Sequence, residues 1–163
     1  MKRIGIISDT HGVFDNALKQ FLEPVDEIWH AGDIGSLELA DRIAAFKPLR
    51  AVYGNIDAEP TRREFPAFRH LDCEGASVIM THIGGYAGRF EQRVAEQIAL
   101  RKPDIFVSGH THILKIFRDK TFGILCINPG AAGRKGIHPT RTAVRLTIDN
   151  GRVANVEVGE WPR

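Results

Sequence analysis

The chain has 163 residues, the size of one domain, and a core of this size needs no disulfide or structural zinc to fold. Hydrophobic residues make up 43% and charged residues 26%, as is ordinary for a soluble globular protein, and the formal net charge of +2 gives no indication of a nucleic-acid-binding surface. No stretch approaches the roughly 20 apolar residues of a membrane span. We therefore expect one domain over residues 1–163, located in the cytoplasm, with Cys73 and Cys126 as buried, reduced thiols.

The first third of the chain alternates between continuous apolar runs, typical of buried strands, and stretches with apolar residues on one helical face. The predicted order is strand 3–8, helix 14–22, strand 27–33, helix 36–46 and strand 49–55. Ser36 has the side chain of an N-cap for the second helix. Strands and helices in this alternation indicate parallel strands joined by right-handed crossovers.

The rest of the chain begins with residues 61–72, which look irregular or edge-like because Pro66 interrupts them. Next come a predicted strand at 76–82, a helix at 88–101 and a strand at 104–107. Alternating runs divided by turn signals then predict antiparallel strands at 113–119, 122–128, 141–151 and 152–158. We expect an α/β domain with two sheets or one mixed sheet.

Polar side chains follow five of the predicted parallel strands at the point where each strand ends. They are Asp9 and His11, Asp33, Asn55, His82, and His110 with His112. Parallel strands bring their carboxyl ends to one edge of a sheet, where ligands bind in open α/β proteins. These side chains should therefore lie together in space. Of the other histidines, we interpret His30 and His70 as structural and leave His138 open.

The donor set points to metal chemistry. Carboxylate, imidazole and amide donors without thiolate suit first-row divalent ions better than an all-oxygen calcium site. Seven donors are too many for one tetrahedral ion, but they fit two ions that are roughly 3.5–4 Å apart and share a bridging carboxylate. Such a pair can hold a hydroxide at neutral pH and bind a phosphoryl oxygen.

These motifs resemble a known family. Five motifs are similar, in order and spacing, to those of the calcineurin-like metallophosphoesterases. They are Asp9-x-His11, Gly32-Asp33, Gly54-Asn55, His82 and Gly109-His110-Thr-His112. The resemblance runs from residue 3 to about residue 157 and is strongest to the small bacterial and archaeal phosphodiesterase branch. Asn128-Pro129-Gly130 also resembles an Asn-Pro-Gly-Ser stretch of that branch. The resemblance implies a two-sheet β-sandwich flanked by helices, the four-layer αββα arrangement that Vps29 shares.

The resemblance also implies a role for each donor. One ion would be bound by Asp9, His11, Asp33 and His112, and Asn55, His82 and His110 would complete the second, with Asp33 as the bridge. Asn55 would also contact the substrate phosphate, and a hydroxide bridging the ions would be the nucleophile. Both ions would be divalent, with manganese preferred and iron, nickel or zinc as alternatives. Because His110 and His112 are two apart in a segment predicted to be extended, they could reach the same side and serve different ions.

One departure from the family pattern concerns proton transfer. Many members of the superfamily have histidine where this chain has Ile56, and that histidine is usually taken to protonate the leaving oxygen. Isoleucine cannot donate a proton, and general acid catalysis is typically worth about 10²–10⁴-fold. The small branch often lacks this histidine too. The sequence therefore predicts a preference for leaving groups that need little protonation, or a proton from His138 or water.

The substrate charge can also be compared with the site. Two divalent ions carry four positive charges, and Asp9, Asp33 and a bridging hydroxide cancel three of them. The remaining charge matches a phosphodiester, although monoesters stay open. We expect a small phosphodiester as substrate and no membrane partner, with nucleic acid only as a substrate and with a monomer or homodimer as the assembly. Nucleotide, nucleic-acid-end and lipid-derived diesters all fit.

Three interpretations remain. The first is a metal-dependent phosphoesterase, preferentially a phosphodiesterase. The second is a protein-binding scaffold like the retromer subunit Vps29, which has this fold. The third is an α/β protein with scattered loop histidines and no metal. Because all seven donor positions are filled, the sequence favours the enzyme.

Overall fold

The computed structural model describes residues 1–86 and 89–163 and contains two mixed five-stranded sheets. In spatial order, the first sheet consists of β12 (Arg152–Pro162), β11 (Thr140–Asp149), β1 (Lys2–Ile7), β2 (Glu27–His30) and β3 (Leu49–Ala51). The second consists of β4 (Phe68–Cys73), β5 (Ala76–Thr81), β8 (Ile105–Val107), β10 (Leu125–Pro129) and β9 (Leu114–Arg118). A small ribbon pairs β6 (Gly85–Tyr86) with β7 (Arg89–Phe90).

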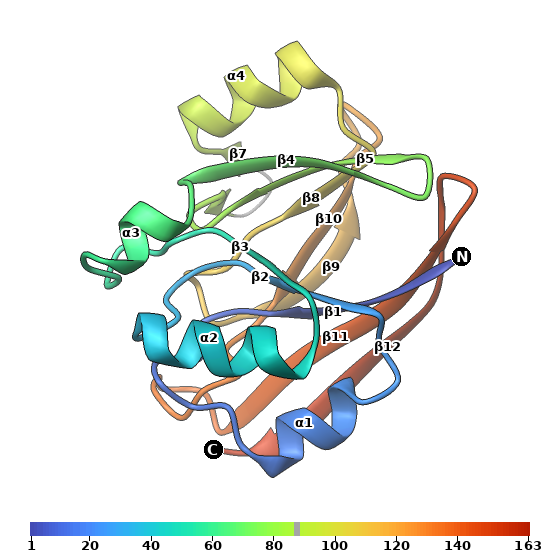
Figure 1. Cartoon of the computed structure of the whole chain (residues 1–163). Helices are drawn as coiled ribbons and strands as arrows, with labels where there is room; N and C mark the ends of the chain where they lie inside the picture. The colour runs from blue at the N-terminus through green and yellow to red at the C-terminus, as the bar shows by residue number, and fades with distance from the viewer. Residues whose placement is uncertain (87–88) are drawn as a thin grey trace.

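Four helices accompany the sheets: α1 (Asn16–Leu22), α2 (Leu37–Phe46), α3 (Thr61–Glu64) and α4 (Gln92–Arg101). Figure 1 shows α1 and α2 on the outer side of the first sheet and α4 on the outer side of the second. The predicted two-sheet sandwich flanked by helices is therefore confirmed. None of the described helices is long and apolar enough to cross a membrane.

The core explains the layers. Alternate residues of both sheets point inward and form one buried cluster that includes Ile4, Ile6, Trp29, Val78, Met80 and Ile105. The outward residues of the first sheet pack against α1 and α2, and those of the second pack against α4. Because the inner strands are covered on both faces, they read as continuous apolar runs in the sequence.

Local sequence signals set the starts of α1 and α2. Ser36 accepts a hydrogen bond from the Leu39 N–H at 3.1 Å, so the predicted N-cap of α2 is confirmed. Asp15 caps α1 by accepting from the Leu18 N–H at 3.3 Å. Both thiols are buried, as predicted, and burial raises the pKa of Cys126 to about 11.

Three of the predictions for the later chain need correction. Residues 61–72 are not irregular: they contain α3 and most of β4, which does lie at a sheet edge. The helix predicted at 88–101 starts only at Gln92, because residues 89–90 pair in β7, while residue 88 lies outside the described residues. Strand β10 is antiparallel to β9, as expected, but its other neighbour, β8, is parallel.

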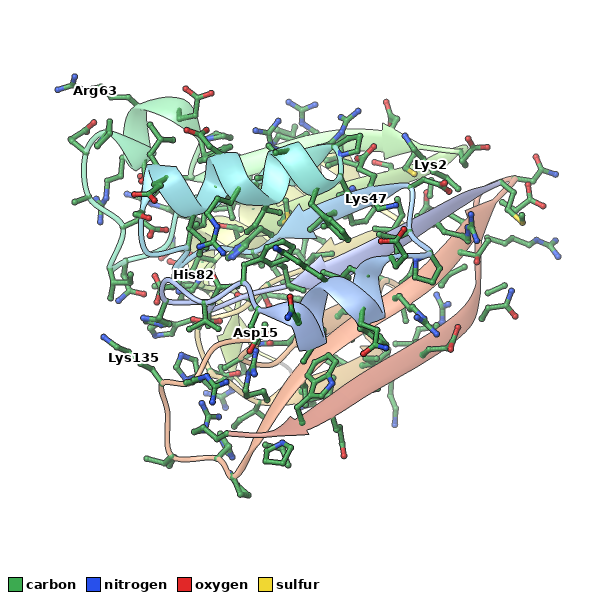
Figure 2. All side chains as sticks on the ribbon, turned by 60° about the horizontal axis from the view of Figure 1, so that its bottom comes forward. Lys2, Asp15, Lys47, Arg63, His82 and Lys135 are labelled. Carbon is green, nitrogen blue, oxygen red and sulfur yellow. The ribbon has the colours of Figure 1, made fainter. Side chains whose placement is uncertain are left out.

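The parallel strands form one functional end. β1, β2 and β3 are parallel neighbours in the first sheet, and β5 and β8 are parallel neighbours in the second. The loops after these five strands lie at the same end of the sandwich, since the donors that they carry come within a few ångströms of one another. Figure 2 shows His82 at this end.

Candidate metal centre

The structure brings the predicted donors from both sheets into one cluster. Two groups can each hold an ion, Asp9 with His11 and His112, and Asp9 with Asp33 and His82. His110 adjoins this pair of groups, since its ring centroid lies 5.2 Å from that of His82, and Asn55 adjoins His110 through its Oδ1, 3.0 Å from Nδ1. All seven residues therefore converge, as the strand-end pattern predicts.

Asp9 lies at the centre of the cluster. Its Oδ2 accepts hydrogen bonds from the Ser8 hydroxyl at 2.7 Å and from the His110 N–H at 3.1 Å. This fixes the carboxylate and turns Oδ1 toward the imidazoles. Oδ1 lies 3.2 Å from Nε2 of His112 and 3.9 Å from Nε2 of His11.

Asp33 is placed where a bridging ligand would be needed. Its Oδ1 accepts from the Ile56 N–H at 3.0 Å. Its Oδ2 lies between two histidines, 3.5 Å from Nε2 of His11 and 3.3 Å from Nε2 of His82. Gly54 makes this placement possible, because a Cβ there would lie 2.0 Å from the Asp33 Oδ1.

Hydrogen bonds orient two of the histidines, one to a carbonyl group outside the cluster and one to Asn55 within it. His82 Nδ1 lies 2.7 Å from the carbonyl oxygen of Ala31, which must accept the proton. Nε2 therefore presents its lone pair to the site, as a metal ligand requires. His110 Nδ1 lies 3.0 Å from the Asn55 Oδ1, and Asn55 is exposed at the outer side of the cluster.

The backbone reaches this arrangement in a way that the sequence pattern did not predict. Five of the seven donor residues have positive φ: Asp9 (52°), His11 (44°), Asp33 (56°), His110 (71°) and His112 (63°). The segment that carries His110 and His112 is thus not extended, and the expectation of two side chains on one side of a strand is wrong. Left-handed turns aim these side chains instead, and such conformations concentrate at functional sites.

Buried ligand atoms that lack a hydrogen bond indicate whether the site suits a metal ion. The Asp9 Oδ1, His11 Nε2 and His82 Nε2 atoms are buried and make no hydrogen bond with any described residue. Buried polar atoms are nearly always paired, so three unpaired ligand atoms within one cluster call for a missing partner. A divalent cation satisfies an anionic oxygen and two imidazole lone pairs together, and the residues present therefore fit such a group.

The negative charges of the Asp9 and Asp33 carboxylates favour positive charge in the cluster. Burial lowers the pKa of His11, whereas the Asp9 carboxylate raises the pKa of His112. Burial opposes protonation of His82, but the neighbouring Asp33 and Asp9 outweigh it and raise the pKa of this histidine. Metal ligands must be deprotonated, so metal binding should release protons and weaken as the pH falls.

Three residues that support the loops of the cluster were not assigned this role from the sequence. Asp57 is buried and accepts from the N–H groups of Ile34, Gly35 and Gly54 at 2.8–3.1 Å, joining the loop of Asp33 to the loop of Asn55. Asn128 donates to the carbonyl of Gly109 and the hydroxyl of Thr111, both at 3.0 Å, and so holds the loop of residues 108–112, called the histidine loop below. The Asn-Pro-Gly stretch was the available signal for Asn128.

The third is Arg163, whose guanidinium holds the loop of residues 133–140. It donates to carbonyl groups of this loop at Gly133, Lys135, His138 and Thr140. The loop passes His112 closely, since a Cβ on Gly136 would lie 2.7 Å from its Nδ1. Figure 2 shows Lys135 at the same end as His82. No motif near residue 163 could have indicated this role.

The histidines assigned to structure behave differently from the donors. His70 lies on β4 and takes no part in the cluster, and neither does the open candidate His138. His30 is fully buried beneath the site, with Nε2 2.9 Å from the Thr10 hydroxyl and Nδ1 accepting from the Gly32 N–H. Since Thr10 donates to the carbonyl of Ile34, His30 Nε2 must carry the single proton.

We expect His30 to make the fold acid-sensitive. Burial lowers its pKa to about 4, against about 6.5 in an unfolded chain. Below pH 6.5 the unfolded chain takes up a proton that the folded chain does not, so the free energy of unfolding falls by about 2 kcal/mol between pH 8 and pH 5. His30→Gln should remove this part of the pH dependence in urea unfolding. An unchanged pH slope in the variant would contradict the expectation.

Known proteins are similar to this chain in sequence and in fold. The family description "Calcineurin-like phosphoesterase superfamily domain" matches residues 1–151. A probable metallophosphoesterase of Methanothermobacter thermautotrophicus is 29% identical over 134 residues, which cover 78% of this chain and 76% of that protein. A structure described as a novel archaeal phosphodiesterase is 25% identical, with a TM-score of 0.75 and coverage of 96% of this chain and 99% of the other.

A third similarity concerns the fold alone. The zinc complex of wild-type Vps29 from Entamoeba histolytica has a TM-score of 0.75 at 15% identity and covers 98% of each chain. The family match, by contrast, spans all seven predicted donors. With its sandwich of two sheets and its cluster of histidines and aspartates at the strand ends, this chain belongs to the calcineurin-like phosphoesterase superfamily.

Proposed function

We propose that the protein is a phosphoesterase that depends on two divalent cations and prefers phosphodiesters. One observation carries the proposal: three buried, unpaired ligand atoms from Asp9, His11 and His82 face one another in a cluster of carboxylates and imidazoles. The archaeal phosphodiesterase of the same fold supports the choice of diesters. Manganese is the cation that we propose first, with iron, nickel or zinc as alternatives.

The donor residues of the chain would have distinct roles in binding the cations and the substrate. When bound, two divalent cations activate water and stabilise the charge on phosphoryl oxygens. Asp9, His11 and His112 would hold one cation, His82 and His110 would hold the other with Asn55, and Asp33 would serve both. The exposed Asn55 amide can donate to a phosphate oxygen. Lys135 adds positive charge at the same end.

Proton donation to the leaving group has no dedicated residue at position 56. Ile56 uses its backbone N–H to hold Asp33, and the residue is 46% exposed beside Asn55. Leaving groups that are stable as anions, such as p-nitrophenolate, should therefore react well without an acid. Poor leaving groups should depend on a proton from water.

Ile56→His is expected to raise the rate with a poor leaving group. A histidine at this exposed position can protonate the leaving oxygen, and general acid catalysis is worth up to about 10²–10⁴-fold. We would compare kcat for methyl phenyl phosphate with kcat for bis(p-nitrophenyl) phosphate, and expect a gain only with the phenyl ester. Ile83→His, at an exposed isoleucine after His82, is the matched control. Equal rates for wild type and Ile56→His would contradict the missing-acid explanation.

Two substrates test the proposed function directly. Protein stripped of metal and reloaded with manganese would be given bis(p-nitrophenyl) phosphate or p-nitrophenyl phosphate. We expect turnover only after reloading, with the diester faster. Turnover that is faster with the monoester would reject the diester preference, and no turnover with manganese, iron, nickel or zinc would reject the enzyme.

A second candidate function is a protein-binding scaffold, as in the alternative based on Vps29. An exposed isoleucine directly follows three of the predicted ligands: Ile56 after Asn55, Ile83 after His82 and Ile113 after His112. Their exposed fractions are 46%, 39% and 50%. Apolar side chains around a metal centre would suit a protein partner, and the absence of turnover in the assay above would favour this function.

A further inference from the structure

A cavity of about 330 Å³ lies on the outer face of the second sheet, directly behind the histidine loop. Its walls include Ser108 and Thr111 from the loop after β8, and Gly84 and Gly85 from the segment between β5 and the end of β6. Both loops also carry predicted metal ligands. The cavity and the metal centre are thus the two sides of the same pair of loops.

The loop of residues 108–112 contributes residues to both. On one side, the His110 N–H donates to the Asp9 Oδ2, and Gly109 packs so closely that a Cβ would lie 2.0 Å from the Ser8 hydroxyl oxygen. On the other side, Ser108 and Thr111 line the cavity. A substrate whose phosphate lies beside His110 could therefore extend one of its ester groups around this loop.

The floor of the cavity is aromatic. Phe90, Phe106 and Phe117 contribute their rings, and Phe90 meets Phe106 edge to face at a centroid distance of 5.6 Å. Ile113, which is half exposed, forms part of the rim. Rings prefer offset or edge-to-face contact with other rings, so this floor favours a flat aromatic group over an aliphatic one. The volume falls within the range of small-molecule sites.

The charge on the rim is positive. Arg89 and Lys115 line the cavity and are exposed, with the Lys115 ammonium 4.7 Å from the centroid of the Phe117 ring. None of the lining residues in the described part of the chain is acidic. The hydroxyls of Ser108 and Thr111 add polar groups on the side of the metal centre. The combination fits an aromatic group attached to an anion.

We propose that this cavity binds an aromatic ester group of the phosphodiester whose phosphate lies at the metal centre. The inference rests on the proposed function for the phosphate but uses residues that the metal centre does not. It predicts that aryl diesters bind better than alkyl diesters of the same charge. The expected preference is at least about 10-fold in Kd.

Binding to metal-free protein tests the cavity without any turnover. ¹⁵N-labelled protein would be titrated with diphenyl phosphate and with diethyl phosphate. We expect amide shifts at Lys115 and Phe117 with diphenyl phosphate, and a Kd about 10-fold lower than for diethyl phosphate. Thymidylyl-thymidine distinguishes a nucleobase from a simple aryl group: binding as tight as diphenyl phosphate assigns the cavity to a nucleoside, and weaker binding assigns it to a small arene. Equal affinity for the phenyl and ethyl diesters would overturn the proposal.

Two variants sharpen the test. Lys115→Glu places a negative charge on the rim and should weaken diphenyl phosphate binding about 10-fold or more, whereas Lys120→Glu, the same change at an exposed lysine outside the cavity, should not. Phe117→Ala should abolish the preference for the phenyl ester. Because the same spectra report folding, an unfolded Phe117→Ala protein would be recognised, and Lys115→Glu would decide alone. Equal weakening by both lysine variants would overturn the proposal.

The cavity and the proposed function can fail separately. If arenes bind but the reloaded protein shows no turnover, the proposed aryl binding in the cavity is supported and the phosphodiesterase activity is rejected. If the protein turns over bis(p-nitrophenyl) phosphate, and diphenyl phosphate inhibits this reaction no better than diethyl phosphate does, the proposed enzyme is supported. The proposed aryl binding in the cavity is then overturned.

Discussion

Asp33→Asn is expected to lower metal-dependent phosphodiester hydrolysis by about 10³-fold or more, because the residue proposed to bridge the two cations loses its negative charge. The Asp33 Oδ2 lies within 3.5 Å of both His11 and His82, so the substitution affects both halves of the cluster. The asparagine oxygen can still accept from the Ile56 N–H, which should keep the loop in place. Rates with bis(p-nitrophenyl) phosphate at saturating manganese would measure the loss.

Metal content separates a ligand from a merely structural residue. The wild-type protein should hold two ions per chain by elemental analysis, and Asp33→Asn should hold fewer while its circular dichroism stays unchanged. His110→Ala should also abolish turnover with the fold intact. Full turnover in both variants would show that the cluster is not the site of hydrolysis. His70→Ala is the matched control, since His70 lies on β4, outside the cluster.

Asp57→Ala is expected to lower the free energy of unfolding by about 3–5 kcal/mol. The carboxylate accepts three backbone hydrogen bonds at 2.8–3.1 Å, and only 3% of the residue is exposed. Without it, three N–H groups in the loops after β2 and β3 lose their partner, and each unpaired buried donor costs about 1–3 kcal/mol. Urea unfolding of metal-free protein would measure the change.

Asp57→Asn provides the graded control. The asparagine amide keeps one oxygen, which can accept some of the three hydrogen bonds. The free energy of unfolding should therefore fall less than with alanine. If Asp57→Ala unfolds within about 1 kcal/mol of the wild type, the three hydrogen bonds do not hold the loops together. The order wild type, asparagine, alanine is therefore the expected ranking of stability.

The sequence predicted the layers and the convergence of the donors because both follow from short-range rules. Continuous apolar runs such as residues 3–8 marked the buried strands, and Ser36 marked the start of α2. Polar residues after parallel strands then had to meet at one edge. Seven residues spread over about a hundred positions could be placed together by this argument alone, without any contact being known.

The features that were missed depend on contacts between distant segments. The β7 pairing that delays α4 to Gln92, and the parallel partner of β10, follow from strand neighbours that periodicity does not specify. The roles of Asp57 and Arg163 depend on which backbone groups come within their reach. The cavity behind the histidine loop appears only once β9 lies beside β10 at the sheet edge.

The five left-handed donors have a consequence for how such a protein evolves. Each non-glycine residue at positive φ carries a conformational cost that glycine would remove, and Asp9, His11, Asp33, His110 and His112 all carry it. Mutation to glycine at one of the three histidines would relax the backbone while removing a proposed metal ligand, whereas at Asp9 or Asp33 it would also remove a carboxylate that accepts a backbone hydrogen bond. Selection that preserves the site would therefore act against substitutions that relax the backbone, and a lineage released from that selection should lose His11, His110 and His112 before the two aspartates.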